Sequence, residues 1–139
     1  MPAPYLWDLP NGLRVAYQRV PATRVLHCGL CADVGSRDEA PGQEGMAHFL
    51  EHMLFKGTQR RHPGHIMSRV DAVGGELNAY TTKEKTLLYT ASAGTYLGRS
   101  LELLADLAFR STFPEKEVAK ERMVVAEEID MYDDTPEEA

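Results

Sequence analysis

The dipeptide Asn11-Gly12 restricts the folds that are open to this chain. It lies between two short runs with apolar residues, 6–9 and 13–20, and Asn-Gly favours a tight β-hairpin turn because both residues accept positive φ angles. Residues 24–34 follow as a further strand-like run. A chain that opens with a hairpin and a third strand is not all-helical, so we expect antiparallel pairing at its N-terminal end.

Glycine and proline residues divide the remaining chain into helical and extended segments. We expect a loop over residues 35–45, helices over residues 46–56, 65–73, 95–110 and from 114 to about 132, and strands over residues 76–81 and 86–92. The resulting order, βββααββαα, predicts an α+β fold in which helices pack on one face of a mixed or antiparallel sheet. A length of 139 residues fits one domain, residues 1–139.

Charge and hydropathy exclude several classes of partner. The formal net charge is −6 and Lys and Arg form no long cluster, which argues against nucleic acid. There is no apolar run of the roughly 20 residues that span a bilayer, and the first ten residues do not resemble a signal peptide. We therefore expect no membrane partner and a cytoplasmic location, or the mitochondrial matrix if a transit peptide has been removed.

Cys28 and Cys31 form a CxxC pair within the third strand-like run. Such a pair is typical of a redox motif or half of a zinc site. In a strand, however, residues three apart point to opposite faces, and no second CxxC is present. We interpret them as two reduced structural cysteines.

The segment His48-Phe49-Leu50-Glu51-His52 carries the clearest chemical pattern. On a helix, residues four apart lie on one face, so both imidazoles can bind one tetrahedral zinc ion. Glu51 borders the same face and can act on a metal-activated water as a general base. The alternative is that the histidines are accidental helix neighbours. The other histidines, His27, His62 and His65, are expected to be structural or surface residues.

A third ligand is expected from the last helix. Glu121, Val125 and Glu128 share a stripe at helical spacing, and carboxylates among valines are costly to bury unless a metal or a histidine compensates them. The alternative is a boundary surface from which both carboxylates reach solvent. Glu127 lies on the adjacent stripe and competes with Glu128, and helical geometry alone does not choose between them.

Three blocks of sequence resemble the pitrilysin/insulinase family of zinc peptidases, the inverzincins. They read GMAHFLEHMLFKGT at residues 45–58, GGELNAYT at residues 74–81 and ERMVVAEEID at residues 121–130. The resemblance is greatest to the branch that contains the mitochondrial processing peptidase β-subunit and its bacterial homologues. It extends over nearly the whole chain, and the inverted HxxEH motif is a feature of the family.

The resemblance implies a complete zinc peptidase site. In the family the third zinc ligand is a glutamate 76 positions after the second histidine, which corresponds to Glu128. The implied metal ligands are therefore His48, His52 and Glu128, with one Zn²⁺ per site. Glu51 would be the base in hydrolysis of peptides or unfolded segments. Glu121 corresponds to a further family glutamate, which would support catalysis by orienting a ligand or by tuning the metal-bound water.

The family also implies partners. Asn78, Ala79 and Tyr80 lie in a strand to whose edge an extended peptide substrate would pair, although an ordinary half-buried strand fits the same residues. Family members enclose the substrate between two or more domains, so we expect this N-terminal zinc-peptidase-like domain to be incomplete at its C-terminal end. A C-terminal half or a second subunit would close the chamber.

Three other functions stay open on the sequence. The chain could be a non-catalytic processing-peptidase-like partner or structural subunit, although such subunits lack part of the zinc set. It could be a truncated product that is inactive on its own. A zinc hydrolase with a substrate other than a peptide would use the same activated water.

Overall fold

The computed structural model describes residues 3–134, with side chains described to residue 131. Its strands and helices follow the expected order. They are β1 (Tyr5–Asp8), β2 (Arg14–Tyr17), β3 (Val25–Ala32), α1 (Met46–Met53), α2 (Pro63–Asp71), β4 (Glu76–Thr81), β5 (Thr86–Ala93), α3 (Leu97–Phe109) and α4 (Glu115–Asp134). The predicted α+β class is confirmed, and every strand pairing among the described residues is antiparallel.

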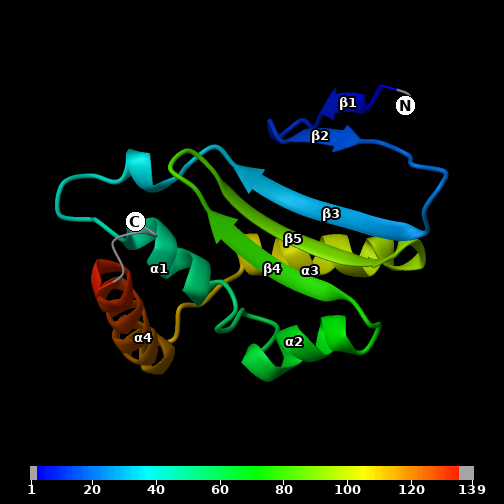
Figure 1. The fold of residues 1–139 in the computed structure, drawn as a ribbon. Coiled ribbons are helices and arrows are strands. Elements are labelled where there is room, and N and C mark those ends of the chain that lie inside the picture. The colour runs from blue at the N-terminus through cyan, green and yellow to red at the C-terminus, as the bar shows by residue number, and fades with distance from the viewer. Residues whose placement is uncertain (1–2, 135–139) are drawn as a thin grey trace.

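The N-terminal hairpin forms as expected. Tyr5 pairs with Tyr17, and Gly12, at φ 89°, donates its N–H to the carbonyl of Leu9. The Asn11 side chain accepts a hydrogen bond from the Leu13 N–H and tightens the turn. The hairpin is a two-stranded sheet of its own and lies apart from the main sheet (Figure 1).

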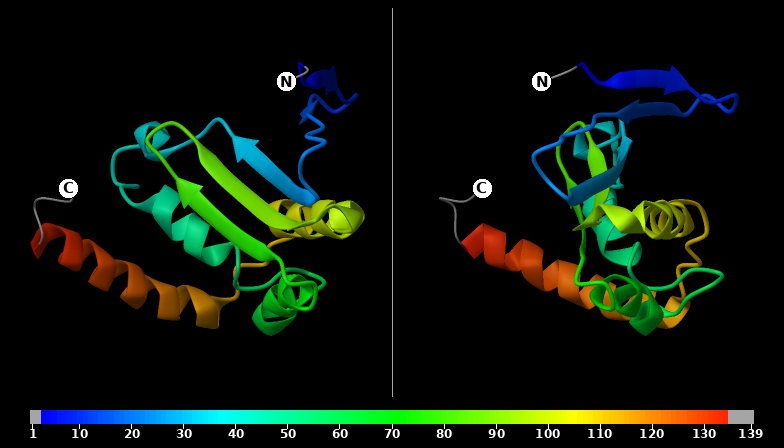
Figure 2. Two further views of the ribbon diagram at one scale, coloured as in Figure 1. Left: turned by 45° about the vertical axis from the view of Figure 1, so that its right-hand side comes forward. Right: turned by 90° about the vertical axis from the view of Figure 1, so that its right-hand side faces the viewer.

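The main sheet has the order β3-β5-β4, with β5 in the centre. Burial alternates along β4, where Leu77 and Ala79 face the covered side and Asn78 and Tyr80 are exposed. This is the period-two pattern of a sheet that is covered on one face. Two helices, α2 and α3, supply the cover (Figure 2).

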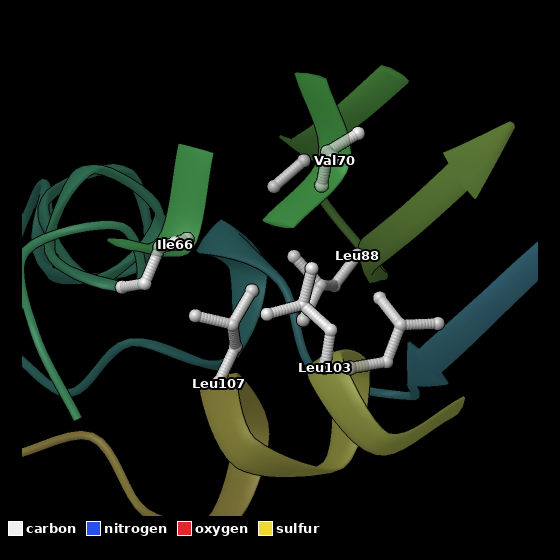
Figure 3. Close-up of a cluster of buried hydrophobic side chains, with 7 residues drawn as sticks. Ile66, Val70, Leu88, Leu103 and Leu107 are labelled. Carbon is white, nitrogen blue, oxygen red and sulfur yellow. The ribbon is translucent and has the colours of Figure 1, made fainter. Parts of the chain in front are cut away.

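Apolar side chains from these helices and from the sheet form the core (Figure 3). Its buried members are Ile66, Val70, Ala79, Leu88, Leu103, Leu104 and Leu107. Leu88 comes from the central strand and meets the leucine stripe of α3. The helical spacing of its apolar residues predicts one stripe on α3, made of Leu97, Leu101, Leu104 and Ala108. Leu104 is buried, but Leu97 and Leu101 are 43% and 52% exposed, and Leu103 and Leu107 share the buried face with Leu104 instead.

Several helix ends differ from the expected positions. Helix α1 ends at Met53 rather than at residue 56, since residues 54–56 form a turn before Gly57, whose φ is 134°. Helix α2 begins at Pro63, a position in the first turn where proline needs no N–H partner. Helix α3 is preceded by a short 3₁₀ turn at residues 94–96. No helix in the described part of the chain is long and apolar enough to cross a membrane.

Candidate metal centre

Gly45 and the Glu39 carboxylate fix the start of helix α1, and the start of the helix determines where its histidine side chains point. Gly45 adopts a left-handed conformation with φ 87°, which favours glycine because it has no Cβ. The Glu39 carboxylate then accepts hydrogen bonds from the N–H groups of Gly45 and Ala47, at 3.0 and 2.8 Å. These are N–H groups at the helix start that have no partner within the helix, and a negative charge there also suits the helix dipole.

His48 and His52 project from the same face of α1, as their spacing predicts. Their rings meet edge to face with centroids 4.8 Å apart, and their Nε2 atoms are 3.1 Å apart. Two neutral imidazole nitrogens at this separation repel each other unless a proton or a cation lies between them. The pair can therefore share a proton in a hydrogen bond or bind one cation together.

Glu128 of α4 completes a triangle of donors. Its Oε2 lies 3.1 Å from His48 Nε2 and 3.2 Å from His52 Nε2. Two ligands at about 2.0–2.1 Å from a tetrahedral zinc are roughly 3.3 Å apart, so the three atoms fit one zinc ion with little movement. In the described part of the chain, this is the only group of three such residues close enough to hold a metal. Helices α1 and α4 lie side by side and bring the donors together (Figures 1 and 2).

The centre is open on one side. The side chains of His48 and Glu128 are 35% and 39% exposed, and that of His52 is 22% exposed. A metal with three protein ligands and an open fourth position is typical of catalytic rather than structural zinc sites. The donor set is thus suited to a metal that also binds water or substrate.

Glu121 lies seven residues, about two helical turns, before Glu128 and is buried. Its Oε2 is 2.9 Å from His52 Nδ1, and its Oε1 accepts a charged hydrogen bond from Lys56 Nζ at 3.0 Å. Burial raises the pKa of Glu121, but the hydrogen bonds from Lys56 and His52 outweigh it and hold that pKa below its ordinary value. An ionised Glu121 accepts the Nδ1 proton of His52, which leaves the Nε2 lone pair free for a metal.

Glu51 faces an open cleft beside the donors. The cleft has a volume of about 340 Å³ and lies between α1, α4 and β4. Its lining consists of Glu51, His52, Phe55, Lys56, Asn78, Ala79, Glu121 and Val124. Of the three donors, His52 lines this cleft together with Glu51. A carboxylate next to a metal-binding group is the arrangement that water activation needs.

Strand β4 forms one wall of this cleft and is at the edge of the main sheet. The Asn78 side chain is exposed, and its Oδ1 accepts a hydrogen bond from the Ala79 N–H at 2.8 Å. That N–H therefore points away from β5, towards the open edge. The Ala79 side chain is buried, while the exposed Tyr80 ring meets Tyr89 edge to face at 6.1 Å.

The structure separates the two candidates for the third donor. Glu127 is exposed and is not in the donor group, whereas Glu128 is half-buried beside the histidines. His62 and His65 stack on each other with centroids 3.5 Å apart, outside the donor group. Cys28 and Cys31 are free thiols, and burial raises the pKa of Cys28, which disfavours the reactive thiolate.

Two contributors were not expected from the sequence. From the sequence, we expect Lys56 at the end of the helix over residues 46–56 and Glu39 in the loop over residues 35–45, with no role at the metal centre for either. The signal for Lys56 was its position four residues after His52, which continues the ligand face past the helix end. For Glu39 no local signal existed, because it caps a helix that begins seven residues later.

Comparison with known proteins points in the same direction. Residues 14–139 match the family model described as insulinase (peptidase family M16). An uncharacterized zinc protease of Bacillus subtilis is 42% identical over 128 residues, covering 92% of this chain and 31% of the relative. One of Mycobacterium bovis is 46% identical over 99% of this chain and 31% of its own length. A probable mitochondrial-processing peptidase subunit beta of Arabidopsis thaliana is 40% identical over 87% of this chain and 23% of its own length.

A solved structure shares the fold. The crystal structure of a protease from Helicobacter pylori superposes with a TM-score of 0.87 and 36% identity, over 91% of this chain and 31% of that chain. The chain thus spans about a third of the length of these bacterial relatives.

Proposed function

Because this chain belongs to the insulinase family of peptidases (M16), the resemblance of its three sequence blocks is confirmed, and we propose that it carries the active site of a zinc metalloendopeptidase of the HxxEH type. The metal ligands in this proposal are His48, His52 and Glu128. The substrates are peptides or unfolded protein segments.

The triangle of donor atoms carries the proposal. Two imidazole nitrogens and a carboxylate oxygen lie 3.1–3.2 Å from one another, on two helices that are far apart in sequence. Relatives at 42% and 46% identity are named zinc proteases. A nitrogen and oxygen donor set with an open position suits zinc, and bound there zinc would supply a Lewis acid for the scissile carbonyl and for water.

The protein's own residues would then move the protons. Glu51 takes the proton of the attacking water and passes it to the leaving amine. Glu121 keeps His52 oriented through the Nδ1 hydrogen bond, and Lys56 keeps Glu121 ionised. The extended substrate would pair with the open edge of β4 at Asn78, Ala79 and Tyr80, with Asn78 releasing the Ala79 N–H to the substrate.

The rest of the enzyme would come from outside these 139 residues. Its relatives are about three times as long, which supports a further domain or a second subunit that closes over the cleft. On this view residues 1–139 form part of an N-terminal domain. We place the protein in the cytoplasm, or in the matrix for a mitochondrial form.

Replacement of Glu51 by Gln tests the proposed base. The amide cannot accept the proton, so peptide hydrolysis should fall by about 10²–10⁴-fold in the full-length protein, while zinc content stays at one per chain. Fluorogenic peptide turnover and elemental analysis measure the two quantities. Glu127→Gln, a change at an exposed carboxylate, should leave both unchanged. Full activity in the Glu51 variant would show that another group is the base.

A further inference from the structure

Asp106 is a fully buried carboxylate that has no part in the metal centre described above. Its Oδ2 accepts hydrogen bonds from Thr58 Oγ1 at 2.7 Å and from Arg61 Nη1 at 2.8 Å. Arg110 Nη1 lies 3.6 Å from its Oδ1. A buried charge is costly unless it is paired. The hydrogen bonds from Thr58 and Arg61 offset the cost of removing the Asp106 carboxylate from water.

Thr58 connects this carboxylate to the loop that follows α1. Its Oγ1 donates to Asp106 and also accepts the N–H groups of Arg60 and Arg61, at 3.2 and 3.0 Å. The hydroxyl therefore holds the loop in one conformation and fastens it to α3. Thr58 is only six residues after His52.

The same loop is paired with the segment that leads into α4. Thr58 forms an antiparallel bridge with Ser111, the Gln59 N–H donates to the Arg110 carbonyl at 2.9 Å, and the Thr112 N–H donates to the Gly57 carbonyl at 3.1 Å. We call residues 57–61, Asp106 and residues 110–112 the junction. It joins the end of the helix that carries both histidines to the start of the helix that carries Glu128.

Backbone geometry beside the junction points to an imposed conformation. Phe113 has φ 48°, although it is not glycine and precedes Pro114. A residue before proline prefers extended angles, and positive φ costs free energy that only a strongly constraining environment maintains. Phe113 is 43% exposed, so burial of its ring does not account for this conformation. The hydrogen-bonded backbone of Arg110 and Thr112 comes directly before it.

We propose that Thr58 and Asp106 are positioning residues for the metal centre: by locking the junction they set the separation of α1 and α4, and with it the fit of His48, His52 and Glu128 to the metal. This inference rests on the proposed zinc site. Neither residue contacts the donors, and each acts through the helices.

The charge state of Asp106 agrees with this role. Burial raises its pKa, but the hydrogen bonds from Thr58 and Arg61 outweigh burial and hold the pKa below its ordinary value. Asp106 is therefore ionised at neutral pH and accepts both hydrogen bonds.

Zinc affinity of Thr58 variants tests the inference in the full chain. Thr58→Val has nearly the same shape but no hydroxyl, and should weaken zinc binding roughly three- to tenfold, less than the ~10–100-fold typical of a group bonded directly to a ligand. Thr58→Ser keeps the hydroxyl and should restore the wild-type affinity. Competition with a chromophoric chelator, well below the melting temperature, gives the dissociation constants.

A core variant separates positioning from general stability. Ile66→Val removes one methyl group from the fully buried core and should lower the melting temperature without weakening zinc binding. If Thr58→Val melts earlier but binds zinc as wild type does, the junction only stabilises the fold and the inference is overturned. If Thr58→Val does not fold, Arg61→Lys, which loses the forked contact to Asp106 and Glu102, decides by the same criterion. Absence of zinc from the wild-type chain would overturn the proposed zinc site itself.

Discussion

Three glutamates of α4 have different environments because their neighbouring residues differ. Glu121 is buried between Lys56 and His52, Glu128 lies half-buried against both histidines, and Glu127 is exposed. All three are on α4 within eight residues. Their environments, rather than their chemical type, separate the proposed orienting group Glu121, the proposed metal ligand Glu128 and the exposed charge of Glu127.

The ion pairs around Arg61 predict a dependence of stability on acid pH. The hydrogen bond from Arg61 holds the pKa of Glu102 below its ordinary value. A carboxyl whose folded-state pKa is lowered contributes stability that is complete above its unfolded pKa, near 4, and is lost as the pH falls through the lower folded value. The free energy of unfolding should therefore decrease below about pH 4.

Glu102→Gln should reduce this acid-dependent loss, since the amide does not titrate. Urea unfolding at a series of pH values measures it, with Glu76→Gln, an exposed carboxyl on β4, as the control that keeps the wild-type profile. Identical acid slopes for Glu102→Gln and wild type would show that this ion pair does not contribute.

Among the elements, α1 depends most on a distant contact. Its first N–H groups are capped by Glu39 from the preceding loop. Glu39→Ala should destabilise the protein by about 0.5–2 kcal/mol, the range for loss of a helix cap. Zinc affinity should fall with it, because the first turn of α1 carries His48.

Thermal unfolding and a zinc titration measure these effects. Glu44→Ala is the matched control, since its exposed carboxylate accepts a hydrogen bond from the Gly42 N–H within the loop and not from the first turn of α1. Equal losses in the two variants would mean that removal of charge from the loop, and not the cap, causes the change.

The elements that could be predicted from the sequence are those with local signals. Asn11-Gly12 predicted the hairpin, and Gly74 and Gly75 predicted the break before β4. The i, i+4 spacing of the two histidines predicted that they lie on one face of their helix. Contacts made across the fold had no such signal. The Thr58–Asp106 bond joins residues 48 positions apart, and the choice of Leu103 and Leu107 as the buried stripe of α3 depends on how α3 meets the sheet.

The metal centre could be predicted only in part from local sequence signals. Sequence spacing indicated His48 and His52 as a pair but left Glu127 and Glu128 equivalent, because adjacent stripes on a helix differ only in which one faces the partner element. The family resemblance selected Glu128, and the packing of α4 on α1 brings that residue to the histidines. Whether these residues bind zinc stays a prediction.

On the scale of the whole molecule, much apolar surface is open. Phe109 is 71% exposed and Leu101 52% exposed, and an apolar hollow of about 610 Å³ lies between β3, α1 and α3. The chain spans about a third of the length of its bacterial relatives.

We therefore expect these 139 residues alone to bind zinc but to cleave peptides at least about a hundredfold more slowly than a full-length relative, because orientation of the substrate accounts for a large part of catalysis. Peptide turnover at matched zinc occupancy measures the ratio, with the Mycobacterium bovis relative as the reference. Equal turnover would show that the cleft beside β4 suffices for catalysis.

Zinc stoichiometry after dialysis tests whether His48, His52 and Glu128 together hold one metal ion. Glu127→Gln and Glu128→Gln form a matched pair, in which the same change is made at adjacent residues. We predict close to one zinc per chain for wild type and Glu127→Gln, and a large loss for Glu128→Gln. Zinc retained in the Glu128 variant, or lost in the Glu127 variant instead, would contradict the assignment.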